Sequence, residues 1–363
     1  MILMNSTSMV IGISIWALIS FIISHAIIGE NSVNTSTSIN DAFVGDIVTT
    51  QNHNSSKMLP NFRDPKVGGL MVFYHVAKTG GTAIRNIFER MAKDRPNDFV
   101  SRRITIFDPT YDTWPVRKRD TCPPINNKAR HRMRHLLPTV ESLLQSEEPE
   151  RTILLEIHGG EYGLKAMAEH INEWRKKSNK NSRPFFAFTL LRNPVDFSVS
   201  YFNYFHYGCS EPWCDVQYDD ASEDNLIKSI DRHSNLQCFF LLHDLHASFY
   251  ERCKPTETEC NTIYQILKES LDWVGTTENI SSETIPLVTY MLDGTKNSSE
   301  DSDKVNVSEK GILKMLDQST AMELKSRMEF DSKLYDAVKE EFSFHKYYAG
   351  LFHESLIEDK VNA

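Results

Sequence analysis

"LMVFYHVAKTGGTAIRNIF", residues 70–88, joins two apolar patterns across a short polar turn. The first part is a continuous apolar run of strand length, which is typical of a strand buried on both faces in a parallel sheet. From Thr82 onward, the apolar residues recur at helical spacing. Between them stands the turn Lys-Thr-Gly-Gly-Thr, residues 78–82. A turn of this kind aims backbone N–H groups and the positive end of the helix at one point, so the stretch predicts a phosphate site.

The turn differs from the phosphate loop of nucleotide hydrolases, which reads Gly-x4-Gly-Lys-Ser/Thr. Here Lys78 precedes the glycines Gly80 and Gly81, and no acidic strand end is placed to hold magnesium. The pattern therefore disfavours a kinase or ATPase. The structural alternative is an ordinary strand-to-helix turn with a surface lysine.

Strand-like and helix-like stretches alternate along the chain, which predicts a doubly wound α/β fold. We expect a P-loop-like parallel sheet flanked by helices. The predicted strands cover residues 69–76, 151–159 and 184–194, and the predicted helices cover 161–177, 195–205 and, as one helix or a pair, 319–342.

A second candidate anion site follows the strand 184–194. Arg192 ends this strand, and Ser200 lies eight residues later in the next helix. Arginine offers a planar fork of donors to phosphate oxygens, and serine adds a hydroxyl. Open α/β sheets bind ligands at the carboxyl ends of their strands. Two such strand ends predict a ligand with two separated phosphates lying across that edge.

These stretches together resemble the sulfotransferases, in particular the membrane-anchored Golgi carbohydrate sulfotransferases. "HVAKTGGT" (75–82) and "LLRNPVDFSVSYF" (190–202) carry the resemblance most specifically, in this order and about 110 residues apart. Weaker similarity lies in "SNLQCFFL" (234–241), in "LDWVGTTENI" (271–280) and in the C-terminal part from 306 to 342, which is most like the heparan sulfate 2-O-, uronyl and chondroitin branches. The resemblance covers about residues 69–345 in patches.

The resemblance implies that the donor is 3′-phosphoadenosine-5′-phosphosulfate (PAPS). Lys78 would neutralise charge on the bridging oxygen as the sulfuryl group leaves, and Arg192 with Ser200 would hold the 3′-phosphate. The 5′-phosphate would be held by Thr79, Gly80, Gly81 and Thr82. A sulfuryl group carries less charge than a phosphoryl group, so we expect no metal.

An acceptor hydroxyl must lose a proton, and His158 is the first candidate for the base. It ends the predicted strand 151–159, at the same sheet edge as the two anion motifs. A neutral imidazole near pH 7 suits this role, and a histidine in a similar context serves it in related carbohydrate sulfotransferases. Glu161 and Glu156 are the rivals, and Glu161 is also a candidate for binding substrate. The structural alternative is a histidine that caps a strand.

The N-terminal residues 9–28 carry no charge over a length that can cross a bilayer as a helix. We expect a signal anchor rather than a cleaved signal, because that apolar run is longer than a signal core and lacks a clear cleavage site. The predicted parts are a cytosolic tail (1–8), a transmembrane anchor (9–28), a flexible luminal stem (29–65), a sulfotransferase domain (66–350) and a C-terminal tail (351–363).

Six cysteines, all after the predicted anchor, fit an oxidising compartment. The favoured bridges are the short loops Cys209–Cys214 and Cys253–Cys260. Asn-x-Ser/Thr sequons, which add weak support for a luminal body, lie at Asn34, Asn54, Asn279, Asn297 and Asn306.

The net charge of −9 provides no overall basic field, so we expect no nucleic-acid partner. Local basic clusters remain, and Arg130, Arg132 and Arg134 are the candidates for binding an acidic polysaccharide. The sequence thus predicts a single-pass type II Golgi membrane sulfotransferase that acts on a glycan hydroxyl. A protein-tyrosine sulfotransferase and a non-catalytic luminal nucleotide-binding protein are the alternatives, and the oligomeric state, the sugar and the ring position stay open.

Overall fold

The structure is a computed structural model. It describes residues 59–63, 68–105, 151–158, 163–206, 218, 220–243, 254–294, 316 and 318–343. All of them fall in one unit, Lys57–Ala363. The predicted anchor, the C-terminal tail, Arg130, Arg132, Arg134 and Glu161 lie outside the described residues. Among the residues described, no helix combines the length and the apolar character needed to cross a membrane.

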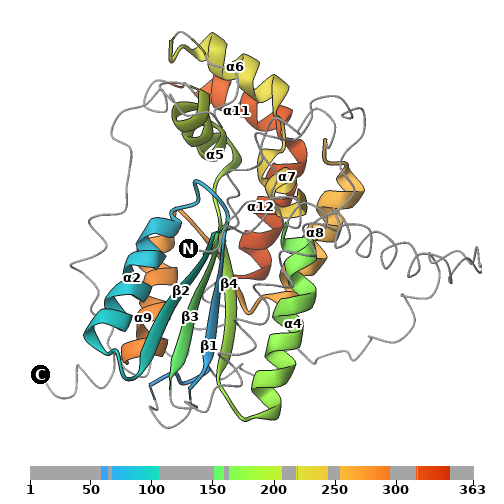
Figure 1. Ribbon diagram of the computed structural model, residues 1–363. Helices are drawn as coiled ribbons and strands as arrows, with labels where there is room; N and C mark the ends of the chain where they lie inside the picture. The colour runs from blue at the N-terminus through green and yellow to red at the C-terminus, as the bar shows by residue number, and fades with distance from the viewer. Residues whose placement is uncertain are drawn as a thin grey trace, which may run out of the picture. The chain divides into compact units, whose positions relative to one another are not determined.

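A five-stranded parallel sheet forms the centre of the described part (Figure 1), as the alternation of strands and helices predicted. Its order is β2-β3-β1-β4-β5, with the strand that precedes the Lys-Thr-Gly-Gly-Thr turn in the middle. The strands are β1 (Leu70–His75), β2 (Phe99–Thr105), β3 (Thr152–His158), β4 (Phe185–Leu191) and β5 (Trp273–Thr276). Because all neighbours are parallel, every strand ends at the same edge of the sheet.

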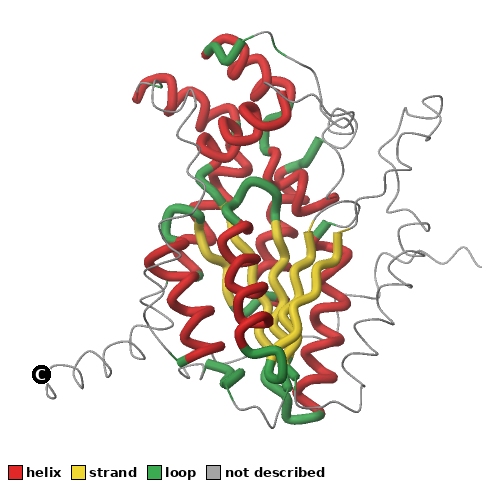
Figure 2. Tube along the Cα trace, turned by 60° about the vertical axis from the view of Figure 1, so that its left-hand side comes forward, coloured by secondary structure: helices red, strands yellow, loops and turns green. Residues whose placement is uncertain are grey.

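Helices cover both faces of the sheet (Figures 1 and 2). α2 contacts α9 on one side, whereas α8 contacts both α4 and α12 on the other. The α-helices are α2 (Gly81–Asp94), α4 (Leu164–Lys180), α5 (Pro194–Tyr201), α6 (Glu223–Arg232), α7 (Leu236–His243), α8 (Glu257–Ser270), α9 (Ile285–Asp293), α11 (Gln318–Arg327) and α12 (Glu329–Glu341), and two π-helical segments are η3 (Phe202–His206) and η5 (Ile280–Thr284).

The middle strands are buried on both faces, which explains their unbroken apolar sequences. Phe73 of β1 stacks on Phe188 of β4 with ring centres 5.0 Å apart. Phe62 also belongs to this core, at 2% exposure, and Leu59 packs against it. Both residues come from the range predicted as stem, so the packed part of the chain includes the end of that range.

Two strands were not predicted from the sequence. β2 is an edge strand whose sequence carries Arg102 and Arg103 in its middle, so it lacks a continuous apolar run. β5 has only four residues, which is too short for a periodic pattern.

A disulfide joins Cys238 of α7 to Cys260 of α8, with Cα atoms 5.7 Å apart. The predicted Cys253–Cys260 bridge is therefore wrong, because Cys260 is already paired with a residue on the neighbouring helix. Short sequence separation was a poor guide here, since helix packing brings Cys238 close. The predicted Cys209–Cys214 bridge lies outside the described residues.

This disulfide is expected to stabilise the fold. Closing a 22-residue separation removes unfolded-state entropy worth about 3 kcal/mol. The double variant Cys238→Ala/Cys260→Ala should therefore lose about that much unfolding free energy in denaturant titrations. The difference in unfolding free energy between wild type and variant should become smaller when both are measured in a reductant. Equal unfolding free energies without reductant would contradict the Cys238–Cys260 bridge.

Candidate active site

The carboxyl edge of the sheet carries several of the polar residues that the sequence singled out, together with Thr277. β1 runs into the turn 76–80, and β3 ends at His158. Arg192 directly follows β4 and Thr277 directly follows β5. His75 and His158 are register partners on neighbouring strands. The predicted strand-end positions of His158 and Arg192 are thus confirmed, and these two residues come from β3 and β4, the strands that flank β1.

The turn before α2 has the geometry of an anion loop. Lys78 and Gly80 both adopt positive φ, at 65° and 84°, so the chain reverses tightly before Gly81 begins the helix. No side chain caps this helix start, which leaves first-turn N–H groups for a ligand. The Thr79 hydroxyl donates to the Val76 carbonyl at 2.8 Å. The proton of this hydroxyl is thereby used inside the turn and is not offered to a ligand.

Arg192 and Thr277 connect this turn to the ends of β4 and β5. The Arg192 guanidinium donates to the Lys78 carbonyl at 3.2 Å. The Thr277 hydroxyl lies 2.9 Å from the Thr79 carbonyl oxygen and 3.2 Å from that of Leu191. The two anion motifs are therefore joined by direct hydrogen bonds.

The Lys78 ammonium lies against an aromatic ring. Its Nζ is 3.9 Å from the centre of the Tyr204 ring in η3. Burial, together with the positive charge of Arg192, lowers the pKa of Lys78 to about 8. The ring face attracts a cation and so opposes this loss of charge. Lys78 stays mostly protonated near pH 7 and carries the charge that its predicted role requires.

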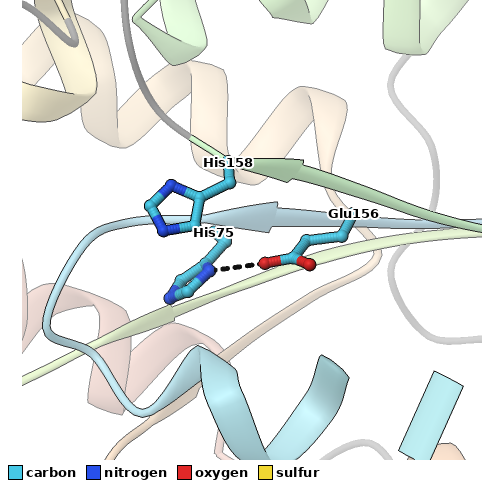
Figure 3. A group of neighbouring side chains, drawn as sticks. All are labelled: His75, Glu156 and His158. Carbon is cyan, nitrogen blue, oxygen red and sulfur yellow. Dashed lines mark hydrogen bonds and ion pairs between the residues drawn. The ribbon is translucent and has the colours of Figure 1, made fainter. Parts of the chain in front are cut away.

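A buried cluster of two histidines and a glutamate stands beside the turn (Figure 3). His75 Nδ1 lies 2.8 Å from Glu156 Oε1, and the rings of His75 and His158 meet edge to face with centres 4.3 Å apart. A Cβ atom at Gly81 would lie 2.0 Å from His75 Nε2. Gly81 is thus required for the imidazole of His75 to pack under the start of α2.

Glu156 is held too firmly to act as a base. Arg85 of α2 donates to both of its carboxylate oxygens, at 2.8 and 2.7 Å, and Arg103 Nε lies 3.6 Å from Glu156 Oε2. Burial alone would raise the pKa of Glu156, but the hydrogen bonds from Arg85 and His75 outweigh it and lower the pKa to about 2. These contacts disfavour Glu156 as the rival base.

His158 remains available as a proton acceptor. Burial, followed by the charge of a protonated His75, lowers its pKa to about 3, so the imidazole is neutral at physiological pH. Its Nδ1 is buried and has no hydrogen-bond partner within the described part of the chain. A base of such low intrinsic pKa accepts a proton only as the acceptor oxygen loses it during bond formation.

A metal ion does not fit this cluster well, although ligand atoms of His75, Glu156 and His158 lie within 4.8 Å of one another. Both carboxylate oxygens are already bound by the guanidinium of Arg85. A cation placed here would face the positive charges of Arg85 and Arg103 at close range.

The remaining residues predicted to bind the donor, apart from the turn itself, lie on helices α5 and α2. Ser200 lies partly buried in α5, and Thr82 is exposed at the start of α2. Sequence reasoning missed His75, Arg85, Tyr204 and Thr277. Thr277 lies in the stretch 271–280 that resembles the sulfotransferases, which was the available signal, whereas Arg85 shows its role only through packing.

Stability should fall as pH falls from 6.5 toward 5, partly because of His158. In this window the unfolded chain protonates His158, whereas the folded chain, with a pKa of about 3, does not. The unfolded state then binds more protons, and each extra proton costs up to about 1.4 kcal/mol per pH unit. His158→Gln should make the fall shallower in denaturant titrations at several pH values.

The matched control is Asn172→Ala, which removes hydrogen bonds with Ser270 and Arg175 but no group that titrates in this window. It should lower stability by a similar amount at every pH in the window. The stability that Glu156 contributes is fully present well above 4.5, its ordinary pKa, and is lost as the pH falls from there toward 2, so most of its pH dependence lies below the window of this comparison. An unchanged slope in His158→Gln would contradict the assignment.

Arg192→Gln should raise the pKa of Lys78 above 8, because it removes a nearby positive charge. NMR titration of the isotopically dimethylated lysines, assigned with Lys78→Arg, would measure the shift. Arg175→Gln, which removes an arginine bonded to Asp272, is the control and should leave Lys78 unchanged. A Lys78 pKa that stays the same in Arg192→Gln would show that the two cations are not coupled.

Comparison with known proteins adds no assignment. No family model matches the chain, and no curated protein matches it.

Proposed function

We propose that the chain is a PAPS-dependent sulfotransferase that transfers a sulfuryl group to a glycan hydroxyl. The observation that carries this proposal is the contact between the two anion motifs. Lys78 and Arg192 come from turns 114 residues apart, yet the guanidinium of one donates to the carbonyl of the other. A donor with phosphates at both ends of its ribose matches two adjoining cationic loops at one sheet edge.

The donor would lie across the ends of β1 and β4. The uncapped first turn of α2 offers N–H groups to the 5′-phosphate, together with Gly80, Gly81 and the hydroxyl of Thr82. Arg192 and Ser200 would bind the 3′-phosphate. PAPS supplies the activated sulfuryl group, whose bond to the bridging phosphate oxygen breaks as the acceptor oxygen attacks sulfur.

The protein's part in the reaction is positioning and charge. Lys78 would place its ammonium at the bridging oxygen and stabilise the charge that develops there. His158 would take the acceptor proton, with its ring orientation supported by His75 and Glu156. The displaced product is adenosine 3′,5′-bisphosphate.

The cellular setting follows from the sequence rather than from the described residues. The charge-free stretch 9–28 would anchor the chain in the Golgi membrane, with the catalytic domain in the lumen. The Cys238–Cys260 bridge agrees with that oxidising compartment. The basic residues Arg130, Arg132 and Arg134 favour an acidic polysaccharide as acceptor.

The test uses the full-length protein, expressed in a secretory host and purified in mild detergent. It is incubated with [35S]-labelled PAPS and a panel of desulfated glycosaminoglycans, neutral chitosan-like sugars and a tyrosine peptide. We expect label on a glycan, with a loss of at least about 100-fold in Lys78→Ala and in His158→Ala. Lys177→Ala, which changes a lysine near the end of α4, is the control and should retain activity.

Label on the tyrosine peptide alone would replace the glycan with a protein acceptor. Absence of transfer, with adenosine 3′,5′-bisphosphate still bound in calorimetry, would overturn the acceptor class but leave the donor site. Absence of both, in protein with a cooperative unfolding transition, would overturn the proposed function.

A further inference from the structure

Gln237 of α7 makes two hydrogen bonds to the backbone of Arg192. The Arg192 N–H donates to Gln237 Oε1 at 2.9 Å, and Gln237 Nε2 donates to the Arg192 carbonyl at 2.7 Å. The amide side chain thus pairs with one residue as a neighbouring strand would. Gln237 is 2% exposed, so solvent does not compete for these bonds.

We call these two hydrogen bonds between Gln237 and the Arg192 backbone the clamp. The clamp matters because Arg192 lies beyond the last paired residues of the sheet. The β4–β5 pairing ends at Leu191 and Thr276, and α5 begins at Pro194. Arg192 therefore receives no support from either a strand ladder or a helix. Its side chain donates to the Lys78 carbonyl, but that bond alone does not fix the main chain from which the guanidinium projects.

Gln237 is itself fixed by a reciprocal pair of helix caps. Both oxygens of the Asp331 carboxylate accept at the start of α7, from the N–H groups of Gln237 and Cys238 at 2.9 and 2.8 Å. In return, Asn235 Oδ1 accepts the N–H groups of Phe330 and Asp331 at the start of α12. Each helix start supplies the cap of the other, so α7 and α12 hold Gln237 in a defined position.

The disulfide adds a covalent anchor next to the clamp. Cys238 follows Gln237 directly and is bonded to Cys260 of α8. Helices α7, α8 and α12 pack on one another. Gln237 of α7 therefore holds the main chain of Arg192, and α8 and α12, which contribute none of the predicted donor ligands, hold α7 in place.

We propose that Gln237 is a positioning residue that aims the Arg192 guanidinium at the 3′-phosphate of the donor. This inference rests on the proposed function and assigns a role outside the two anion motifs. Loss of the clamp should weaken the contact of Arg192 with the 3′-phosphate and leave the binding of the 5′-phosphate by the α2 turn almost unchanged.

The test measures the affinity of the full-length protein for two probes by calorimetry, adenosine 3′,5′-bisphosphate and adenosine 5′-monophosphate. The two probes differ by the 3′-phosphate, so the ratio of the two affinities measures how much this phosphate contributes to binding. We expect a ratio of about 10-fold or more in wild type, the range of a charge-assisted contact. Gln237→Met, which keeps the length of the side chain without its amide, should lower the ratio about 5-fold or more, with the monophosphate affinity changed less than about 2-fold.

Two further variants separate positioning from a general loss of stability. Thr152→Val removes a buried acceptor of the Gly69 N–H at the opposite edge of the sheet, so it should cost stability but preserve the ratio. Arg192→Gln should abolish the ratio, and adding Gln237→Met to it should change nothing more. If Gln237→Met fails to fold, Gln237→Asn keeps the amide but withdraws it by one methylene and should also lower the ratio.

A ratio that stays at the wild-type value in folded Gln237→Met or Gln237→Asn would overturn the inference. An equal loss of both affinities would also overturn it, because it would mark a structural role alone. If wild type binds neither probe, or binds both equally, the proposed donor site is wrong and the inference falls with it. The wild-type titrations thus test the proposed donor site, and the variant titrations test the positioning role of Gln237.

Discussion

The buried carboxylate of Glu156 determines how the carboxyl edge of the sheet is arranged. At 2% exposure its charge needs compensation, and it finds this in Arg85 of α2 and His75 of β1. These contacts tie α2 and β1 to β3 and hold α2 in one orientation on the sheet. His75 can occupy its place only because residue 81 is a glycine. One buried charge thereby sets the positions of the phosphate turn and of His158.

The second half of the site depends on backbone contacts rather than on buried charge. Thr277 links the ends of β4 and β5 to the turn, and Gln237 pairs with Arg192 where the sheet no longer supports it. Glu278 continues this arrangement, since it accepts from the Asn193 N–H and from the Tyr335 hydroxyl, both at 2.8 Å. Loops that bind ligands are usually the mobile part of an α/β protein. Here they are braced by side chains from later parts of the chain.

The sequence predicted those parts that depend on local pattern. The apolar runs of β1, β3 and β4, the helix after the turn and the strand-end positions of His158 and Arg192 follow from periodicity and from parallel topology. The short strand β5 and the arginine-bearing edge strand β2 lack such a pattern. The Cys238–Cys260 pairing and the Arg85–Glu156 bond depend on the packing of helices far apart in sequence, so spacing along the chain did not reveal them.

The two neighbouring cations Lys78 and Arg192 make the site electrostatically favourable for an anion. Burial lowers the pKa values of both Lys78 and Arg192, and each is held near the other. A bound polyanion would relieve this repulsion and raise the pKa of Lys78, which strengthens its charge at the moment the leaving oxygen needs it. The same anion would raise the low pKa of His158 and make it a better proton acceptor. If the proposed donor binds here, its charge would thus act on Lys78 and His158 together and raise the pKa of both.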